Sequence, residues 1–495
     1  MTKSIQKIEY GDFQTPQELA RKVCLLLRQN NIEPKSAIEP TCGIGAFFIE
    51  ALHTFSGLKT GYAFDINNKY IKILKDKLSK EKFSRKSKIE IANFFTKNWK
   101  SELDTLPEPI LVIGNPPWVT NSQLGQLQSD NLPTKYNREG MKGLDALTGK
   151  SNFDISEWMI SRMIDWIQEK KGIVAMLCKT SVARKILLNA WKQNKKMNVA
   201  TMHIIDSKKY FDISADSCLL TITSSDKNCK ECKVYDRLWM KNPIQTIGLR
   251  DNFLVADIPS YEETKYLIDG DEHYQWRTGV KHDCSKVMEL EKVGKNIYIN
   301  GFGDINDLEN RYLFPLLKGS NLANGKISKK FMLVPQTKVG QETKYLQEIA
   351  PKTWNYLVKY GNFLDKRASS IYRGKPRFSV FGIGDYTFKK WKVAIPALYK
   401  KLEFLVVGTY QNKTVVFDDT VNFIALENEK EAHDLANILN SKTANCFFKS
   451  FIFWDSKRPV TVQLLKSLNI DELFIKEGKE QIDSFSKIKR QLRLF

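Results

Sequence analysis

A run of aliphatic residues ends abruptly at a pair of prolines: residues 111–121 read LVIGNPPWVTN. Pro116 and Pro117 lack a backbone N–H and fix φ, so strand pairing stops there. Asn115 and Trp118 are therefore held rigidly where the strand ends. A stiff turn without any chemistry shows the same pattern, so the rest of the chain must decide between a turn and a site.

Short apolar runs alternate with amphipathic helical stretches over the first 225 or so residues. This alternation predicts a doubly wound α/β sheet, mainly parallel. The expected strands are 36–40, 59–66, 87–95, 109–115, 171–179, 200–207 and 217–224. The polar stretch 226–250 is expected to connect this domain to a second one of mixed α/β or α+β class. We place the two domains at residues 1–245 and 246–495.

The 495 residues carry a formal net charge of +21, which favours a polyanionic partner. No apolar run is long enough to span a membrane, and the first ten residues lack the apolar core of a signal peptide. The 8 cysteines are scattered, which is typical of a reducing compartment. We expect a cytoplasmic protein that binds nucleic acid and does not associate with membranes.

A glycine loop separates the first expected strand from its helix in EPTCGIGAFF, residues 39–48. Gly43 and Gly45 allow the backbone to approach a ligand closely. Asp65 follows Gly45 by twenty residues and ends the second strand, where a carboxylate can accept both ribose hydroxyls. A nicotinamide dinucleotide site needs a third glycine, where this chain has Phe48. The loop therefore favours a ligand without a pyrophosphate, such as S-adenosylmethionine.

Several linked motifs resemble those of the γ-class N6-adenine DNA methyltransferases of bacterial restriction-modification systems. They occur in the family's order, as FQTP (13–16), EPTCGIGAFF (39–48), AFDIN (63–67), IANFF (91–95), GNPPW (114–118) and KKYFDISADSC (208–218). The resemblance implies a mixed, seven-stranded, Rossmann-like sheet that binds S-adenosylmethionine. Asn93 departs from the family, which usually carries Asp there, and its NH2 group adds a donor that aspartate lacks.

The resemblance also implies a role for individual residues. The implied cofactor-binding residues are Thr15, Glu39, Thr41, Gly43, Gly45, Asp65, Ile66, Asn93, Phe94 and Asn115. The implied catalytic residues are Asn115, Pro116, Pro117, Trp118 and Phe211. The Asn115 side-chain oxygen and the Pro116 carbonyl would accept the two hydrogens of an adenine amino group, so that its lone pair points at the methyl donor. Trp118 and Phe211 would stack on an adenine that has left the duplex.

The second half resembles a target-recognition region through WRTGVKHDCSK (276–286), SSIYRGKPRFSVFGIGDY (369–386), WKVAIPALYKKL (391–402) and FWDSKRP (453–459). The predicted contacts to phosphates and base edges are Arg277, Lys281, Arg373, Arg377 and Arg458. For each of them the alternative is a solvated surface charge. We expect double-stranded DNA as the partner, and a monomer because one asymmetric chain has no two-fold axis. The sequence leaves three alternatives open: a separately encoded restriction endonuclease as companion, a larger defence complex, or neither.

Other functions share some of these features. Cytosine-C5 methylation needs a cysteine nucleophile in a Pro-Cys pair, whereas Cys42 follows Thr41. Methyltransferases acting on RNA guanine-N2 or on protein glutamine also use NPPY/W, but their small substrate domain usually precedes the catalytic motifs. A catalytically idle DNA-binding subunit would be free to lose Asn115. The sequence shows no Asp…Glu-x-Lys cluster of the kind that would indicate a fused nuclease.

Cys229 and Cys232 have the spacing of a zinc knuckle. No second CxxC follows, and only His282 and Cys284, some fifty residues later, could complete four ligands. We therefore interpret the pair as reduced cysteines and predict no metal site.

Overall fold

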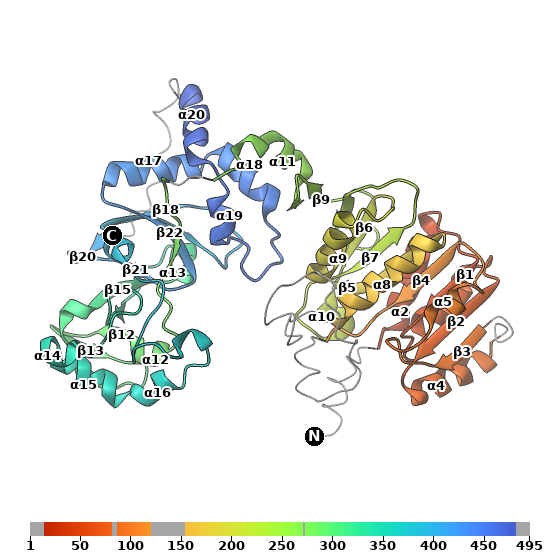
Figure 1. Cartoon of the computed structure of the whole chain (residues 1–495), viewed down its shortest axis with the longest axis horizontal. Coiled ribbons are helices and arrows are strands. Elements are labelled where there is room, and N and C mark those ends of the chain that lie inside the picture. The colour runs from red at the N-terminus through yellow and green to blue at the C-terminus, as the bar shows by residue number, and fades with distance from the viewer. Residues whose placement is uncertain (1–13, 82–86, 120–153, 271–272, 482–495) are drawn as a thin grey trace. The chain divides into compact units, whose positions relative to one another are not determined.

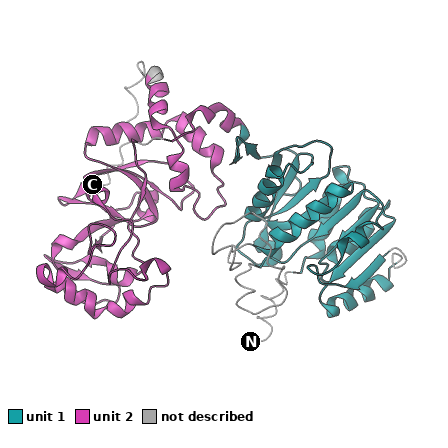
Figure 2. Ribbon diagram, in the orientation of Figure 1, with its two compact units in different colours: residues 1–258 teal, residues 259–495 magenta. Residues whose placement is uncertain are grey.

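The computed structural model describes residues 14–81, 87–119, 154–270 and 273–481. The chain divides into two compact units, residues 1–258 and 259–495 (Figures 1 and 2). Within the described ranges, no helix has the length and apolar character needed to cross a membrane.

A ten-stranded sheet forms the centre of the first unit, in the order β10-β9-β8-β6-β7-β5-β4-β1-β2-β3. Its strands are β1 (Ser36–Glu39), β2 (Thr60–Asp65), β3 (Ser87–Ile91), β4 (Ile110–Gly114), β5 (Gly172–Lys179), β6 (Ala200–Ile205), β7 (Ser217–Thr223), β8 (Glu231–Tyr235), β9 (Gln245–Arg250) and β10 (Phe253–Val255). The pairs that join β3, β2, β1, β4 and β5 are parallel. β7 runs antiparallel to both β5 and β6. All the predicted strands are present, and the predicted mixed, Rossmann-like fold is confirmed.

The expectation of an irregular connection at 226–250 is wrong. β8 pairs in parallel with β6, and β9 pairs antiparallel with β8. Cys232 and Val234 are buried and Lys233 between them is exposed, so the alternation of a half-buried strand is present in ECKVY. The charged residues around this short stretch hid it in the sequence. The sheet therefore has three strands more than the seven expected, and the first unit extends past residue 245 to residue 258.

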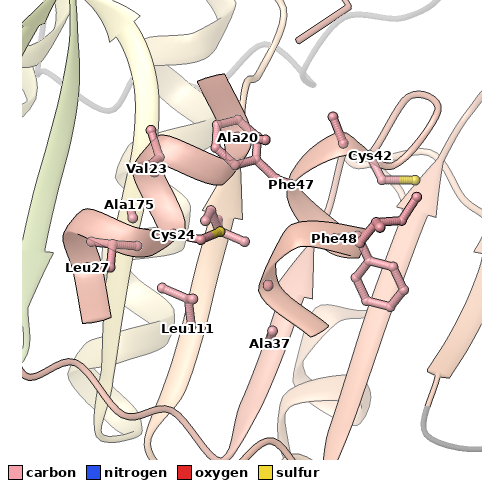
Figure 3. Packing of buried hydrophobic residues seen from close by; sticks show 14 of the residues in the cluster. Ala20, Val23, Cys24, Leu27, Ala37, Cys42, Phe47, Phe48, Leu111 and Ala175 are labelled. Carbon is pink, nitrogen blue, oxygen red and sulfur yellow. The ribbon is translucent and has the colours of Figure 1, made fainter. Parts of the chain in front are cut away.

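Helices α2 and α3 pack against the middle of this sheet (Figure 3). The apolar residues of α2 recur every three or four positions, which places Val23, Cys24 and Leu27 on one buried face. They meet Leu111 of β4 and Ala175 of β5 in one core cluster. The helices of this unit are α2 (Gln17–Gln29), α3 (Ala46–Thr54), α4 (Asn68–Ser79), α5 (Trp99–Leu103), α8 (Ile155–Glu169), α9 (Thr180–Lys192) and α10 (Ser207–Phe211).

The second unit contains two main sheets, each with its own helices. The four-stranded sheet β11-β22-β17-β18 packs against α17 to α20, and the six-stranded sheet β14-β13-β12-β16-β15-β21 packs against α14 to α16. The strands are β11 (Arg277–Thr278), β12 (Glu289–Lys292), β13 (Ile297–Ile299), β14 (Ile305–Asp307), β15 (Leu313–Leu317), β16 (Lys330–Leu333), β17 (Trp391–Pro396), β18 (Leu405–Val407), β19 (Thr409–Tyr410), β20 (Lys413–Thr414), β21 (Val416–Phe417) and β22 (Val421–Leu426). The α-helices are α11 (Ile258–Thr264), α12 (Ser285–Met288), α13 (Gly319–Asn324), α14 (Leu346–Ile349), α15 (Pro351–Lys359), α16 (Gly361–Asp365), α17 (Glu429–Leu439), α18 (Lys442–Phe451), α19 (Val462–Lys466) and α20 (Ile470–Gln481). Short 3-10 helices occur at η2 (Lys265–Leu267), η3 (Asn310–Tyr312), η4 (Ser370–Tyr372) and η5 (Asp385–Phe388).

The extra strands give a test of where the first unit ends. We predict that a fragment ending at residue 258 folds as a monomer and that one ending at residue 245 aggregates. The shorter fragment lacks the buried Ile247 and Leu249 and leaves one edge of β8 unpaired. Size-exclusion chromatography and circular dichroism of both fragments measure this. Two equally folded, monomeric fragments would contradict an integral role for β9 and β10.

Candidate functional site

The carboxyl ends of β1, β2 and β4 meet at one edge of the sheet. β1 lies between β2 and β4 and pairs in parallel with both. Glu39 and Asp65 are the last residues of β1 and β2, and Asn115 directly follows the last residue of β4. Ligands of doubly wound sheets bind at this edge. The fold therefore gathers three predicted site residues that are far apart in sequence.

The loop between β1 and α3 is fastened to the end of β2 by Asp65. The Gly43 N–H donates to Asp65 Oδ2 at 2.7 Å, and the Asn67 N–H donates to Asp65 Oδ1 at 2.8 Å. Gly43 and Gly45 have φ angles of +50° and +83°, the left-handed region that glycine adopts without strain. Thr41 is half-buried in the same loop. A carboxylate has about four lone-pair sites, so Asp65 can also accept the hydroxyls of a ribose.

Gln14 belongs to this site, although the sequence analysis did not select it. Its Oε1 accepts a hydrogen bond from the Ile44 N–H at 3.2 Å. A Cβ atom on Gly43 would come within 2.7 Å of the same oxygen, so the loop and the Gln14 side chain are in close contact. The predicted Thr15 follows and is half-buried. Gln14 stands inside the motif FQTP, which could have indicated it; Phe13 of that motif lies outside the described residues.

Glu39 is buried at the base of the loop, with 3% of its surface exposed. Its Oε2 accepts the Phe48 N–H from the first turns of α3 at 2.8 Å. Burial, and secondly the negative charge of Asp65, raises the pKa of Glu39 well above its ordinary value. Glu39 therefore keeps its proton in the folded protein at pH values where an unfolded chain has released it.

The residues that follow β2 and β3 divide between surface and core. Ile66 is 39% exposed. The Asn93 Oδ1 accepts the Phe95 N–H at 2.8 Å, which stabilises the turn after β3. Phe94 is buried, with its ring centroid 5.1 Å from that of Trp99. The neighbouring Phe95 is half-buried. Cofactor contacts by Asn93 and Phe94 stay predictions.

The predicted catalytic turn leaves β4 without regular secondary structure. The Asn115 Oδ1 is buried, and Pro116 is buried beside it. Trp118 is 7% exposed, and its indole N–H donates to the Leu177 carbonyl of β5 at 3.4 Å. Phe211, the last residue of α10, contacts Trp118 with ring centroids 5.6 Å apart and an interplanar angle of 64°. The structure thus brings the two predicted stacking residues together.

This spacing changes the expected role of Trp118. A base between two parallel rings needs about 7 Å, since each stacked layer takes about 3.5 Å. In this conformation the rings contact each other directly at 5.6 Å, so a base does not fit between them. Trp118 is buried and hydrogen-bonded to β5, whereas Phe211 is half-buried. Phe211 is therefore the better candidate for stacking on a base, and Trp118 packs against the Phe211 ring.

An ion pair between Asp154 and Lys179 joins the start of α8 to the end of β5. Lys179 ends β5, and its Nζ lies 2.6 Å from Asp154 Oδ2. The Asp154 side chain is 7% exposed. Asp154 also caps α8 by accepting the Ser156 N–H at 3.1 Å. The next residue, Ile155, donates its N–H to the Val119 carbonyl at 2.9 Å. Sequence analysis missed this pair because its members are 25 residues apart.

The five predicted DNA contacts lie in the second unit and differ in their surroundings. Three of them form ion pairs with carboxylates: Lys281 with Asp283, Arg377 with Asp365, and Arg458 with Asp419. Arg373 is exposed. Arg277 lies over the ring of Tyr386, with its Cζ 4.9 Å from the ring centroid. The three ion pairs fit the alternative of surface charge as well as they fit a DNA contact.

The four candidate zinc ligands do not belong to one unit. Cys229 and Cys232 lie in the first unit, and burial raises the pKa of the Cys232 thiol. His282 and Cys284 lie in the second unit, where His282 Nε2 is 3.4 Å from Glu289 Oε1. In the described part of the chain, no group of three or more His, Cys, Asp or Glu is placed to hold a metal ion.

Comparison with known proteins decides the family. No protein-family model matches the chain. The chain is 44% identical over 474 residues to the Type II methyltransferase M.NspV of Nostoc sp., a match that covers 94% of this chain and 97% of that protein. The chain belongs to the Type II methyltransferases. It is a DNA methyltransferase of the restriction-modification type, and its cofactor is S-adenosylmethionine.

A solved structure supports the fold of this Type II methyltransferase. The Type IIL restriction-modification enzyme MmeI, solved in complex with DNA, matches with a TM-score of 0.55 and 14% sequence identity. The match covers 98% of this chain and 70% of MmeI. The site residues also suit the cofactor, because the Asp65 carboxylate and the glycine loop offer an acceptor and a close backbone approach to a nucleoside.

Substitution of Asp65 tests the cofactor site. We predict that Asp65→Ala lowers the affinity for S-adenosylmethionine at least about tenfold, because it removes a charged acceptor and releases the Gly43 loop. Isothermal titration calorimetry measures the affinity, and Asp76→Ala, at an exposed position of α4, serves as the control. Unchanged affinity in a folded Asp65→Ala protein would remove Asp65 from the site.

The raised pKa of Glu39 predicts a pH dependence of stability. The folded state holds the Glu39 proton above pH 4.5, the ordinary pKa, and the unfolded state does not. The stability that the folded protein gains from holding this proton is therefore complete below the ordinary pKa, and it is lost as the pH rises through the higher pKa of the folded state. Glu39→Gln keeps an acceptor for the Phe48 N–H but does not titrate.

We expect the stability of the wild type relative to Glu39→Gln to fall with rising pH, by up to about 1.4 kcal/mol per pH unit. Urea-unfolding midpoints of both proteins at several pH values measure the difference. Glu33→Gln, at an exposed position, is the control. Parallel curves for wild type and Glu39→Gln would show that Glu39 is ionised in the folded protein.

Proposed function

We propose that this Type II methyltransferase transfers the methyl group of S-adenosylmethionine to the N6 amino group of an adenine that has left the DNA duplex. The observation that carries the proposal is the Asn115-Pro116-Pro117-Trp118 turn at the end of β4, next to Glu39 and Asp65 at the ends of β1 and β2. The residue types at this turn match the chemistry that an exocyclic amino group requires.

The amino group of adenine is a poor nucleophile because its lone pair is delocalised into the ring. Acceptance of its two hydrogens by the Asn115 Oδ1 and the Pro116 carbonyl lets the nitrogen become pyramidal and directs its lone pair at the methyl group. Acceptors of this kind lower the barrier only if they are fixed in advance. The two prolines, the Trp118 N–H bond to Leu177 and the Val119–Ile155 hydrogen bond supply that rigidity.

Phe211 completes the proposed base site. Its half-buried ring lies at the end of α10 and contacts Trp118, so one face of an extruded base can stack on it. The bound S-adenosylmethionine supplies the electrophilic methyl group. The residues of the chain hold the cofactor through the loop at Thr41–Gly45 and Asp65, and hold the acceptor nitrogen through the turn.

The second unit is proposed to recognise the DNA sequence. The net charge of +21 and the basic residues of this unit support binding to a polyanion, and MmeI, which has a similar fold, was solved with DNA. We further propose that the protein acts as a monomer in the cytoplasm, with a separately encoded restriction endonuclease as companion.

Asn115→Ala tests the proposed chemistry. We expect it to lower methyl transfer at least about a hundredfold, as for other fixed hydrogen-bonding groups in active sites, while binding of cofactor and DNA stays close to the wild type. Single-turnover transfer of a radioactive methyl group measures the rate. Asn98→Ala, at an exposed site before α5, is the control. Near-normal turnover of Asn115→Ala would overturn the mechanism.

Expression in a methylation-deficient bacterial host tests the reaction itself. Modified-base sequencing of the host genome should find N6-methyladenine within one short motif, and the Asn115→Ala protein should leave that motif unmodified. An unmodified genome together with methylated RNA or protein would favour a guanine-N2 or glutamine methyltransferase instead.

A further inference from the structure

The second unit holds an open cavity of about 240 Å³ beside the edge strand β11. It is lined by apolar residues of β22, among them Ala425, and by the polar residues Gln275, Arg277, Tyr386 and Glu431. The lining therefore combines apolar surface with both signs of charge, which suits a planar group whose edge carries hydrogen-bonding atoms.

Arg277 is held in this cavity by neutral groups. β11 pairs with β22 so that Arg277 lies opposite Phe423. Its guanidinium lies over the ring of Tyr386, with the Cζ 4.9 Å from the ring centroid, and one Nη2–H donates to Gln275 Oε1. Gly384 allows this arrangement, because a Cβ atom there would come within 2.6 Å of the Tyr386 ring. The guanidinium plane is therefore fixed before any ligand arrives.

Arg277 differs from Arg377 and Arg458 in the groups that its guanidinium contacts. Arg377 and Arg458 each donate to a carboxylate, those of Asp365 and Asp419. Among the residues that the structure describes, Arg277 forms no such ion pair, and its bond to Gln275 uses one of five N–H donors. Four donors, including a parallel pair, remain for a ligand.

The surroundings favour a base edge over a phosphate. Glu431 also lines the cavity, and its negative charge would repel a phosphate group. Guanine presents two acceptors, O6 and N7, in the major groove, at the spacing of two parallel guanidinium N–H groups. We infer that Arg277, fixed by Tyr386 and Gln275, reads a guanine in the recognised DNA sequence. This inference rests on the proposed function.

The test uses the full-length protein and duplexes that carry the motif found by modified-base sequencing. Each guanine of the motif is replaced in turn by 7-deazaguanine, which pairs normally but lacks the N7 acceptor. We expect one such replacement to lower kcat/KM of the wild type by roughly 10- to 150-fold, the range of one hydrogen bond to a charged group. Arg277→Ala should be slow on the normal duplex and should show no further loss at that position.

Two pairs of variants distinguish the planar geometry of the Arg277 guanidinium from its charge and from effects on folding. Arg277→Lys keeps the charge but loses the planar guanidinium, so its sensitivity to 7-deazaguanine at that position should be smaller than that of the wild type. Tyr386→Phe should retain most of the sensitivity, and Tyr386→Ala should lose much of it. Arg311→Ala, an exposed arginine outside the cavity with its Cζ 6.0 Å from the Tyr312 ring, should respond as the wild type does.

Three results would overturn the inference while leaving the proposed function intact. One is a recognised motif without guanine, and another is an equal relative loss with 7-deazaguanine in wild type and Arg277→Ala. The third is a uniform loss of affinity in Arg277→Ala with a weaker salt dependence, which indicates a phosphate contact. Absence of DNA methylation by the wild type would instead remove the proposed function and the inference together.

Discussion

The hydrogen bond from the Gly43 N–H to Asp65 Oδ2 is the constraint on which the rest of the site depends. Together with the bond from the Cys42 N–H to the Phe64 carbonyl, it holds the loop after β1 against the end of β2. Phe48, in the first turns of α3, is fully buried in the core, so the loop geometry and the packing of α3 are set by the same residues. A shift of the cofactor loop would therefore disturb the core, which keeps the loop in place without a ligand.

The turn after β4, one strand away from β1, is also held in place by contacts with neighbouring elements of the core. The turn after β4 is held by the Trp118 bond to β5 and by the Val119 carbonyl, which accepts the Ile155 N–H. The ion pair of Asp154 and Lys179 joins the start of α8 to the end of β5. Methyl transfer requires donor and acceptor in line within a few tenths of an ångström, and two rigid loops on neighbouring parallel strands provide that alignment.

The sequence predicted the parts of the molecule that depend on local pattern. Long apolar strands such as 171–179 and the glycine loop were found because burial on both faces and left-handed φ angles leave clear signals. The strand at Cys232 and Val234 was missed because it is short and rich in charge. Other features depend on tertiary packing: Phe94 and Phe95 are equivalent in sequence, and only the fold buries Phe94. The pairing of Asp154 with Lys179 has no local signal at all.

In the proposed mechanism, the rigid Asn115 turn accepts the two hydrogens of an adenine amino group. Mass spectrometry of nucleosides tests it most directly, after the purified protein has acted on duplex DNA with S-adenosylmethionine carrying a deuterated methyl group. The deuterated methyl should appear in N6-methyldeoxyadenosine, and Asn115→Ala should remove this product. Label on a cytosine, or on N6 of adenine with equal yield from Asn115→Ala, would contradict it.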